Sequence, residues 1–134
     1  MSLYLDSSAL LKRYFDEPDG DANDRLLASD RVWVTGRHTY LEVRRNLQQR
    51  LETRDLTVAR ENFLADWDGM HVVELDHETC ELAAELAEVT GSRTLDSFHL
   101  AAAARVGRGA LPFVTYDLRQ AQAARSLGWT VLGA

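Results

Sequence analysis

Short apolar runs recur along this chain, and stretches of mixed polarity separate them. The runs contain the β-branched and aromatic residues that favour strands, as in the segment from Val32 to Thr35. We therefore predict five short strands, at residues 3–5, 32–35, 72–75, 112–115 and 129–132.

Between the strands, apolar residues recur at the helical period of 3.6 residues. One such stretch places Tyr40, Val43, Leu47 and Leu51 on a common face. The pattern predicts helices at about residues 7–14, 21–28, 39–51, 56–67, 76–90, 95–106 and 117–127.

Polar residues at the starts of these helices, and a glycine at one end, mark the helix boundaries. Ser7 or Ser8 is suited to cap the first helix, and Thr39 with Glu42 has the spacing of a capping box. Gly91 is placed to end a helix as a C-cap. The alternation of strands and helices predicts an α/β fold of three layers, α/β/α, with a central, mostly parallel five-stranded sheet. At 134 residues, the chain is expected to form one domain over residues 1–134.

Four acidic residues lie where a predicted strand ends or a predicted helix begins. Asp6 and Asp117 follow strands, whereas Glu42 and Asp96 lie in the first turns of helices. In a parallel sheet these strand ends and helix starts share one edge, where ligand sites form. Carboxylates gathered at one point repel one another unless a cation joins them, and Mg²⁺ prefers oxygen ligands of this kind. The four positions predict a metal site, and a metal site of this kind suggests phosphate chemistry.

Each acid also has a local explanation without a metal. Asp6 and Asp117 can be helix caps, and Glu42 and Asp96 suit the positive end of a helix dipole. The argument for a metal site therefore depends on all four meeting at one edge. His99 lies one turn after Asp96 and can either contact the site or serve packing, whereas His38, His71 and His77 show no metal-ligand spacing.

Composition narrows the class of protein. Hydrophobic residues make up 46% of the chain, which is ordinary for a globular protein, and no apolar run is long enough to span a membrane. The single cysteine, Cys80, excludes an intrachain disulfide, and we expect it to pack within a helix. Without a signal-peptide pattern at the N-terminus, we expect a cytoplasmic protein that does not bind membranes.

The net charge weighs against a nucleic-acid partner without excluding one. The formal charge is −6, and acidic proteins are poor candidates for binding phosphate backbones. However, the four proposed metal ligands supply much of this charge, and a bound divalent ion would make the local field more positive.

The motifs around the acids resemble those of a known family. In chain order they are LDSSALLK at 5–12, YLEV at 40–43, RTLDSFHLA at 93–101 and TYD at 115–117. Taken together and in this order, they resemble the PIN-domain ribonucleases, and among these the VapC-type toxins of bacterial toxin–antitoxin systems. The resemblance covers nearly the whole chain.

This resemblance implies a Mg²⁺-dependent endoribonuclease, with Mn²⁺ able to substitute, that cleaves RNA phosphodiester bonds with metal-activated water. It implies that Asp6, Asp96 and Asp117 ligate metal and that Glu42 completes the catalytic site. Thr115 matches a family hydroxyl that hydrogen-bonds near the metal. Lys12, Arg13 and Arg93 lie near the site in sequence and are candidates for contacts with RNA phosphates.

The resemblance also implies partners. These are a VapB-type antitoxin, whose C-terminal segment would cover the active edge, and a second copy of the chain in a homodimer. Apolar residues of the early helices are candidates for the antitoxin groove; they are Leu10, Leu11, Tyr14, Phe15 and Leu26.

Three other functions were weighed against the nuclease. A phosphotransfer receiver domain needs a lysine after the fifth strand, and none follows Leu132. A haloacid-dehalogenase-like phosphatase needs a second acid two residues after Asp6, where Ser8 stands. A catalytically silent PIN-fold module that binds RNA or a protein without cleavage remains an alternative, although all four acids are present.

Overall fold

Five parallel strands form the centre of the molecule. The computed structural model describes residues 2–30, 32–107 and 109–134. The strands are β1 (Ser2–Leu5), β2 (Val32–Gly36), β3 (His71–Val73), β4 (Phe113–Thr115) and β5 (Val131–Gly133). Their order across the sheet is β3-β2-β1-β4-β5, and every neighbouring pair is parallel. The predicted parallel sheet is therefore confirmed.

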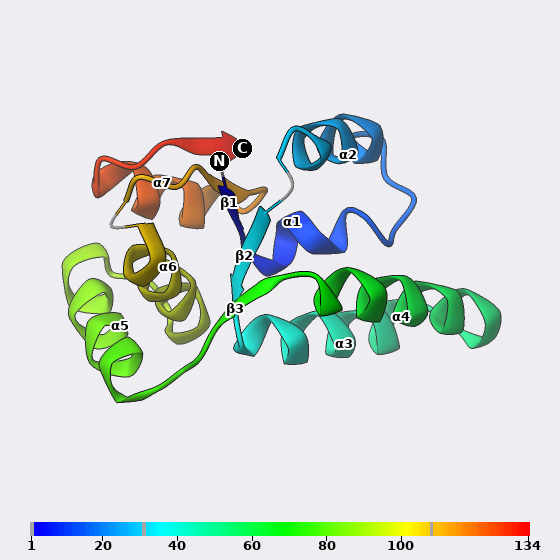
Figure 1. Cartoon of the computed structure of the whole chain (residues 1–134), viewed down its shortest axis with the longest axis horizontal. Helices are drawn as coiled ribbons and strands as arrows, with labels where there is room; N and C mark the ends of the chain where they lie inside the picture. Colours follow the sequence, from blue (N-terminus) through cyan, green and yellow to red (C-terminus); the bar gives the residue numbers. More distant parts are fainter. Residues whose placement is uncertain (1, 31, 108) are drawn as a thin grey trace.

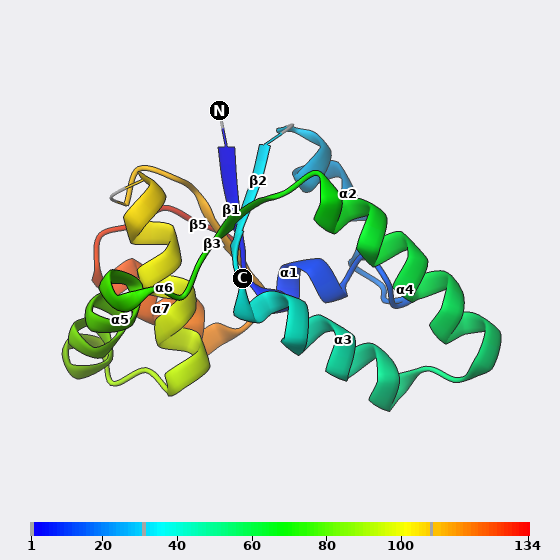
Figure 2. The same ribbon diagram turned by 60° about the horizontal axis from the view of Figure 1, so that its bottom comes forward.

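Helices cover both faces of this sheet, which gives the three-layer arrangement (Figure 1). One face carries α1 (Ser7–Leu11), α2 (Gly20–Ala28), α3 (His38–Arg50) and α4 (Thr53–Asp68). The other face carries α5 (His77–Thr90), α6 (Thr94–Gly107) and α7 (Leu118–Ser126). Figure 2 shows the same division from a second direction, with α3 and α4 packed side by side and extending away from the sheet.

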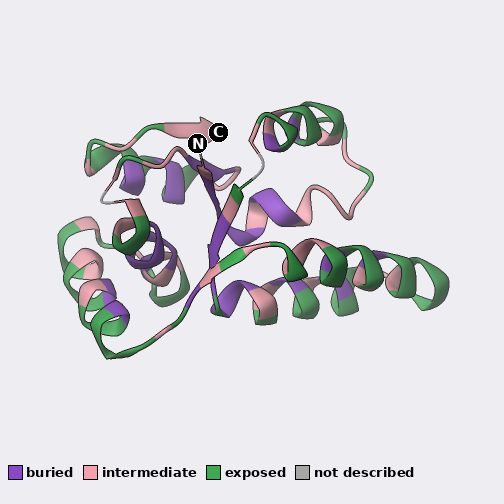
Figure 3. Cartoon of the chain, in the orientation of Figure 1, coloured by how far each residue is buried: buried purple, intermediate pink, exposed green. Residues whose placement is uncertain are grey.

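The alternation of side chains along the strands divides the core into two layers. Leu3 and Leu5 of β1 pack with Leu47 and Phe63 beneath α3 and α4. Tyr4, between them in sequence, points to the other face and joins the cluster under α6 and α7. Figure 3 shows the buried residues along the strands and on the sheet-facing sides of the helices. An apolar layer therefore packs against each face of the sheet.

The order in which strands are added to the sheet reverses at β1: β2 and β3 lie on one side of it, and β4 and β5 lie on the other. The connections from β1 to β2 and from β2 to β3 cross one face, whereas those from β3 to β4 and from β4 to β5 cross the other (Figure 1). The switch point therefore lies between β1 and β4, where the Asp6 amide donates to the Val114 carbonyl at 3.2 Å. Open α/β sheets form their ligand crevices at such points.

Two predicted helix caps are wrong. The cap of α1 is Asp6, whose carboxylate accepts from the Ala9 amide, rather than Ser7 or Ser8. Thr39 does not cap α3, because its Oγ1 lies 2.7 Å from Oγ1 of Thr35 on β2. Gly91 ends α5 in the left-handed region, as predicted.

Two packing predictions also need correction. Cys80 is exposed on α5 rather than packed. Leu10 is fully buried in the core and offers no surface for a partner, whereas Leu11, Tyr14, Phe15 and Leu26 are partly buried.

Across the described ranges of the chain, no helix is long and apolar enough to cross a membrane.

The buried side-chain amide of Asn23 connects helices α1 and α2 to the residue that follows β4. Asn23 of α2 is fully buried; its Nδ2 donates to the Ala9 carbonyl at 3.1 Å, and its Oδ1 accepts from the Tyr116 hydroxyl at 2.9 Å. These two bonds connect α1, α2 and the residue after β4, and so help to hold Asp6 and Asp117 at a fixed separation.

We expect Asn23→Ala to lower the free energy of unfolding by about 2 kcal/mol, since it leaves a buried carbonyl without its partner. Urea unfolding monitored by circular dichroism measures this loss. Asp21→Ala, at an exposed position of the same helix, is the matched control. Equal stability of the two variants would contradict the structural role of Asn23.

Candidate active site

The four predicted acids line one cavity at the switch point. Asp6, Glu42, Asp96 and Asp117 surround a space of about 180 Å³ together with Ser7, Ser8, Leu11, Asn46 and His99. They come from the end of β1, from α3, from the start of α6 and from the residue before α7. The tertiary structure therefore brings together four carboxylates that are spread over most of the chain.

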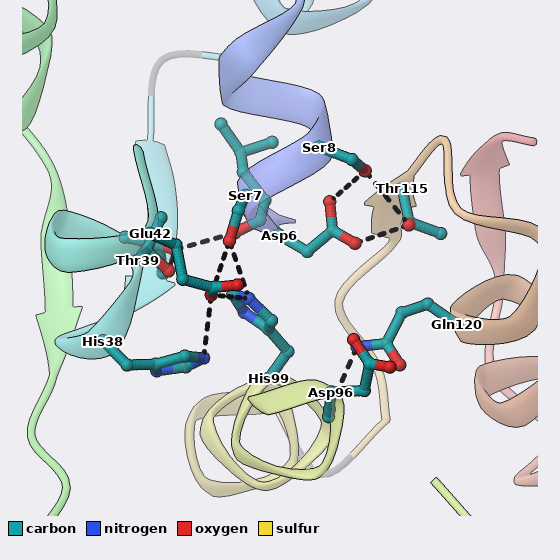
Figure 4. Close-up of polar contacts among 12 residues, drawn as sticks. Asp6, Ser7, Ser8, His38, Thr39, Glu42, Asp96, His99, Thr115 and Gln120 are labelled. Carbon is teal, nitrogen blue, oxygen red and sulfur yellow. Dashed lines mark hydrogen bonds and ion pairs between the residues drawn. The ribbon is translucent and has the colours of Figure 1, made fainter. Parts of the chain in front are cut away.

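Asp6 is held rigidly at the floor of this cavity. It is only 4% exposed. Its Oδ1 accepts from the Ser8 hydroxyl at 2.6 Å and from the Ala9 amide, and its Oδ2 accepts from the Thr115 hydroxyl (Figure 4). Thr115, which ends β4, thus supports the acid that follows β1, and both strands fix the position of one carboxylate.

Glu42 is anchored through a single oxygen. Its Oε1 accepts from the Ser7 hydroxyl at 2.6 Å and lies 2.9 Å from Nε2 of His99 (Figure 4). All the described contacts of this carboxylate are made by Oε1, which leaves Oε2 available to a ligand. This arrangement also explains why Glu42 forms no capping box, since its side chain turns toward α1 and α6 instead of back along α3.

The other two acids are less enclosed. Asp117 caps α7 through Oδ1, which accepts from the amides of Arg119 and Gln120. Asp96 lies on the first turn of α6, where Nε of Arg93 is 3.8 Å from its Oδ2. Asp117 is thus both a helix cap and a cavity residue, so the two interpretations of this position are compatible.

The cavity disfavours the negative charge that it contains. Burial raises the pKa of Asp6, although the charge of His99 and the hydrogen bonds from Ser8 and Thr115 lower it. Burial and then the charge of Asp117 raise the pKa of Asp96. Burial alone would raise the pKa of Glu42, but the hydrogen bonds from His99 and Ser7 hold it below its usual value. A bound cation would relieve this repulsion, and an all-oxygen carboxylate set suits Mg²⁺ or Mn²⁺.

Two histidines join the site: His99, for which the sequence left a contact with the site open, and His38, which the sequence interpretation missed. His99 lies between Tyr4 and Glu42, with Nδ1 2.8 Å from the Tyr4 hydroxyl. His38, to which the sequence assigned no role, has its Nε2 3.7 Å from Oε1 of Glu42. The sequence feature that could have identified His38 is its four-residue spacing from Glu42, which places both residues on one face of a helix.

His38 is buried without a hydrogen bond of good geometry among the described residues. It is 7% exposed, and neither ring nitrogen has a hydrogen-bond partner of good geometry among the described residues. Burial and the neighbouring His99 lower its pKa to about 3, against smaller raising effects from Glu42 and the Leu95 backbone. An unpaired buried polar group of this kind costs about 1–3 kcal/mol.

The predicted phosphate contacts differ in their surroundings. Nζ of Lys12 lies 2.6 Å from Glu17 and 2.9 Å from Asp19, and Arg13 pairs with Asp24 and Asp66. These two bases are already neutralised within the protein. Arg93 is different, because its side chain is 70% exposed and it lines an open cavity with Glu42, Asp96 and Asp117.

Known proteins are similar to this chain in sequence and in fold. Residues 3–126 match the PIN domain family. The chain is 36% identical over 131 residues to Ribonuclease VapC46 of Mycobacterium tuberculosis, covering 98% of this chain and 96% of that protein.

Among solved structures, the fold is similar to that of VapC20 of Mycobacterium tuberculosis, described as a sarcin–ricin loop cleaving toxin. That likeness has a TM-score of 0.69 and 20% identity, and covers 90% of this chain and 94% of VapC20. It is also similar to a toxin–antitoxin complex from Klebsiella pneumoniae, with a TM-score of 0.66 and 14% identity over 86% of each chain. On its sequence and fold, the chain belongs to the PIN domain family, as a VapC-type member.

Proposed function

We propose that this protein is a Mg²⁺-dependent endoribonuclease and the toxin of a toxin–antitoxin pair. The observation that carries the proposal is the single cavity lined by Asp6, Glu42, Asp96 and Asp117. The name of the relative VapC46 as a ribonuclease supports RNA as the substrate. Mn²⁺ is expected to substitute for Mg²⁺, because both ions favour carboxylate ligands.

The four acids of the cavity would have different roles in cleavage. Asp6, Asp96 and Asp117 would hold the ion, with Ser8 and Thr115 fixing the Asp6 carboxylate. When bound, the ion lowers the pKa of a water ligand and stabilises negative charge on the phosphate. Glu42 would complete the site with Oε2, because Ser7 and His99 hold Oε1.

The proposed partners follow from the fold and its relatives. A VapB-type antitoxin is supported by the likeness to a toxin–antitoxin complex, and its C-terminal segment would cover the acidic cavity. Leu11 is partly buried and lines this cavity, so it is placed to contact such a segment. A homodimer and a cytoplasmic location are part of the same proposal.

We expect Asp96→Asn to reduce Mg²⁺-dependent RNA cleavage by about 100-fold or more, a loss typical for groups that stabilise transition-state charge. The metal-free variant should be more stable than wild type by about 1 kcal/mol, since removal of one repelling carboxylate is a stabilising change. Cleavage of a fluorescent RNA and thermal unfolding measure the two effects. Asp68→Asn, at the exposed last residue of α4, is the control. Undiminished cleavage by Asp96→Asn would exclude the proposed site.

Metal binding can be tested without any substrate. Mn²⁺ at 100 times its dissociation constant should stabilise the native state by about 2.7 kcal/mol, because the unfolded chain lacks the assembled site. Thermal unfolding with and without Mn²⁺ measures this shift. Asp96→Asn should show a smaller shift than wild type, and an equal shift in the two proteins would place the ion elsewhere.

Arg93 gives a separate test of RNA binding. Arg93→Ala should weaken binding similarly across RNA sequences and reduce the salt dependence of log K by about 1, as expected for a lost phosphate contact. Fluorescence anisotropy with EDTA present separates binding from cleavage. Arg45→Ala, an exposed arginine on α3, is the matched control. An unchanged slope of log K against log salt concentration for Arg93→Ala would show that this residue does not contact RNA.

The same assays separate the nuclease from the alternative function. Binding of RNA by wild type in EDTA, without cleavage in Mg²⁺, would favour the catalytically silent binding module.

A further inference from the structure

His38, Glu42 and His99 form a compact set of nitrogen and oxygen ligands beside the acidic cavity. His38 and Glu42 lie one turn apart on α3, and His99 approaches them from α6 (Figure 4). Their potential ligand atoms all lie within 4.8 Å of one another. Oε1 of Glu42 is 2.9 Å from Nε2 of His99 and 3.7 Å from Nε2 of His38. The two separations from Oε1 are close to the distance of about 3.3–3.6 Å between tetrahedral donor atoms that share one ion at about 2.0–2.2 Å.

Among the described residues, no hydrogen bond of good geometry accounts for the position of His38, although the Leu95 backbone lies near enough to act on its ring. Its ring is more than nine-tenths buried, neither nitrogen is satisfied, and the ring points toward Glu42 (Figure 4). The end of β2 leaves room for this ring, because a Cβ at Gly36 would lie 2.5 Å from Cε1 of His38. Phe98 packs nearby, with ring centroids 5.6 Å apart. A buried neutral imidazole with a free nitrogen aimed at a carboxylate is the form that ligates metals.

We infer that His38, Glu42 and His99 bind a transition-metal ion of the Zn²⁺ class, at a site that shares only Glu42 with the Mg²⁺ site of the four acids. Imidazole nitrogens favour Zn²⁺, Cu²⁺ and Ni²⁺, whereas Mg²⁺ favours oxygen ligands. Two histidines and one glutamate are a common protein ligand set for Zn²⁺ with a fourth position open.

The surroundings of the set support this assignment. The Tyr4 hydroxyl, 2.8 Å from Nδ1 of His99, supplies the outer hydrogen bond that orients a metal-bound histidine. The bound ion would take the place of the proton between His99 and Glu42. Glu42 and His99 both line the acidic cavity, so an ion can enter from solvent.

The consequence for activity rests on the proposed nuclease function. Glu42 belongs to both ligand sets, and a Zn²⁺ ion bound at Oε1 would neutralise part of the negative charge that Oε2 offers to the Mg²⁺ site. Zn²⁺ would therefore inhibit RNA cleavage without occupying the positions of Asp6, Asp96 and Asp117. The histidines make this inhibition selective for transition metals.

Co²⁺ is the probe for binding, because it replaces Zn²⁺ and its visible absorption reports the ligand geometry. We expect wild type and Asp96→Asn to bind Co²⁺ with the same visible band, and Zn²⁺ to displace it. His38→Gln should bind Co²⁺ about 100-fold more weakly, since the loss of outer-shell groups alone costs 10–100-fold. Binding that survives in His38→Gln but is lost in Asp96→Asn would place the ion among the acids and overturn the inference.

A second variant tests whether a loss of Co²⁺ binding at His38 results from misfolding rather than from the loss of a ligand. His38→Phe removes the unsatisfied ring nitrogens, can pack beside Phe98 and should fold with a melting temperature at least equal to that of wild type. It should also lose the Co²⁺ band. A band that persists in both folded His38 variants would overturn the inference.

Cleavage assays then test the regulation. In Mg²⁺, we expect Zn²⁺ to inhibit wild type, and His38→Gln to need at least about tenfold more Zn²⁺ for the same inhibition. Equal inhibition of both proteins would refute the regulatory role. If neither protein cleaves RNA in Mg²⁺ alone, the proposed nuclease function fails, whereas the Co²⁺ result still decides the metal site.

Discussion

The reversal of strand order at β1 determines where the site forms. Because connections leave β1 across one face and return to β4 across the other, the ends of these two strands are left uncovered as a crevice. Asp6 and Asp117 follow those strands, and α3 and α6 direct Glu42 and Asp96 toward the same place. Two apolar layers, one under α1 to α4 and one under α5 to α7, keep this geometry fixed.

Hydrogen bonds from hydroxyl, amide and imidazole groups make the gathering of four acids possible. Ser7, Ser8 and Thr115 each donate to a cavity carboxylate, and backbone amides at the starts of α1 and α7 hold Asp6 and Asp117. These donors lower the cost of burying charge, but the raised pKa values of Asp6 and Asp96 show that they do not remove it. The folded site therefore keeps an unfavourable concentration of charge, which is a common feature of functional sites.

The errors of the sequence interpretation have a common physical cause. Thr39 and Glu42 have the spacing of a capping box, yet Thr39 bonds to Thr35 of β2, and Glu42 bonds to Ser7 and His99. Leu10 and Cys80 both lie on helices, but packing buries Leu10 fully and leaves Cys80 exposed. Local spacing indicates which bonds a residue can make within its own helix. It contains no information on competing partners from distant elements.

The alternation of strands and helices, the parallel sheet and the four acids at strand ends and helix starts can all be predicted from the sequence. These features follow from local periodicity and from the rule that parallel strands end at one edge. Two features emerge only when the chain is folded: which oxygen of each acid is hydrogen-bonded, and the meeting of His38 and His99, 61 residues apart in the chain, at Glu42. Such contacts depend on how α3 and α6 pack beside the sheet, and that packing is a property of the whole core rather than of any one segment.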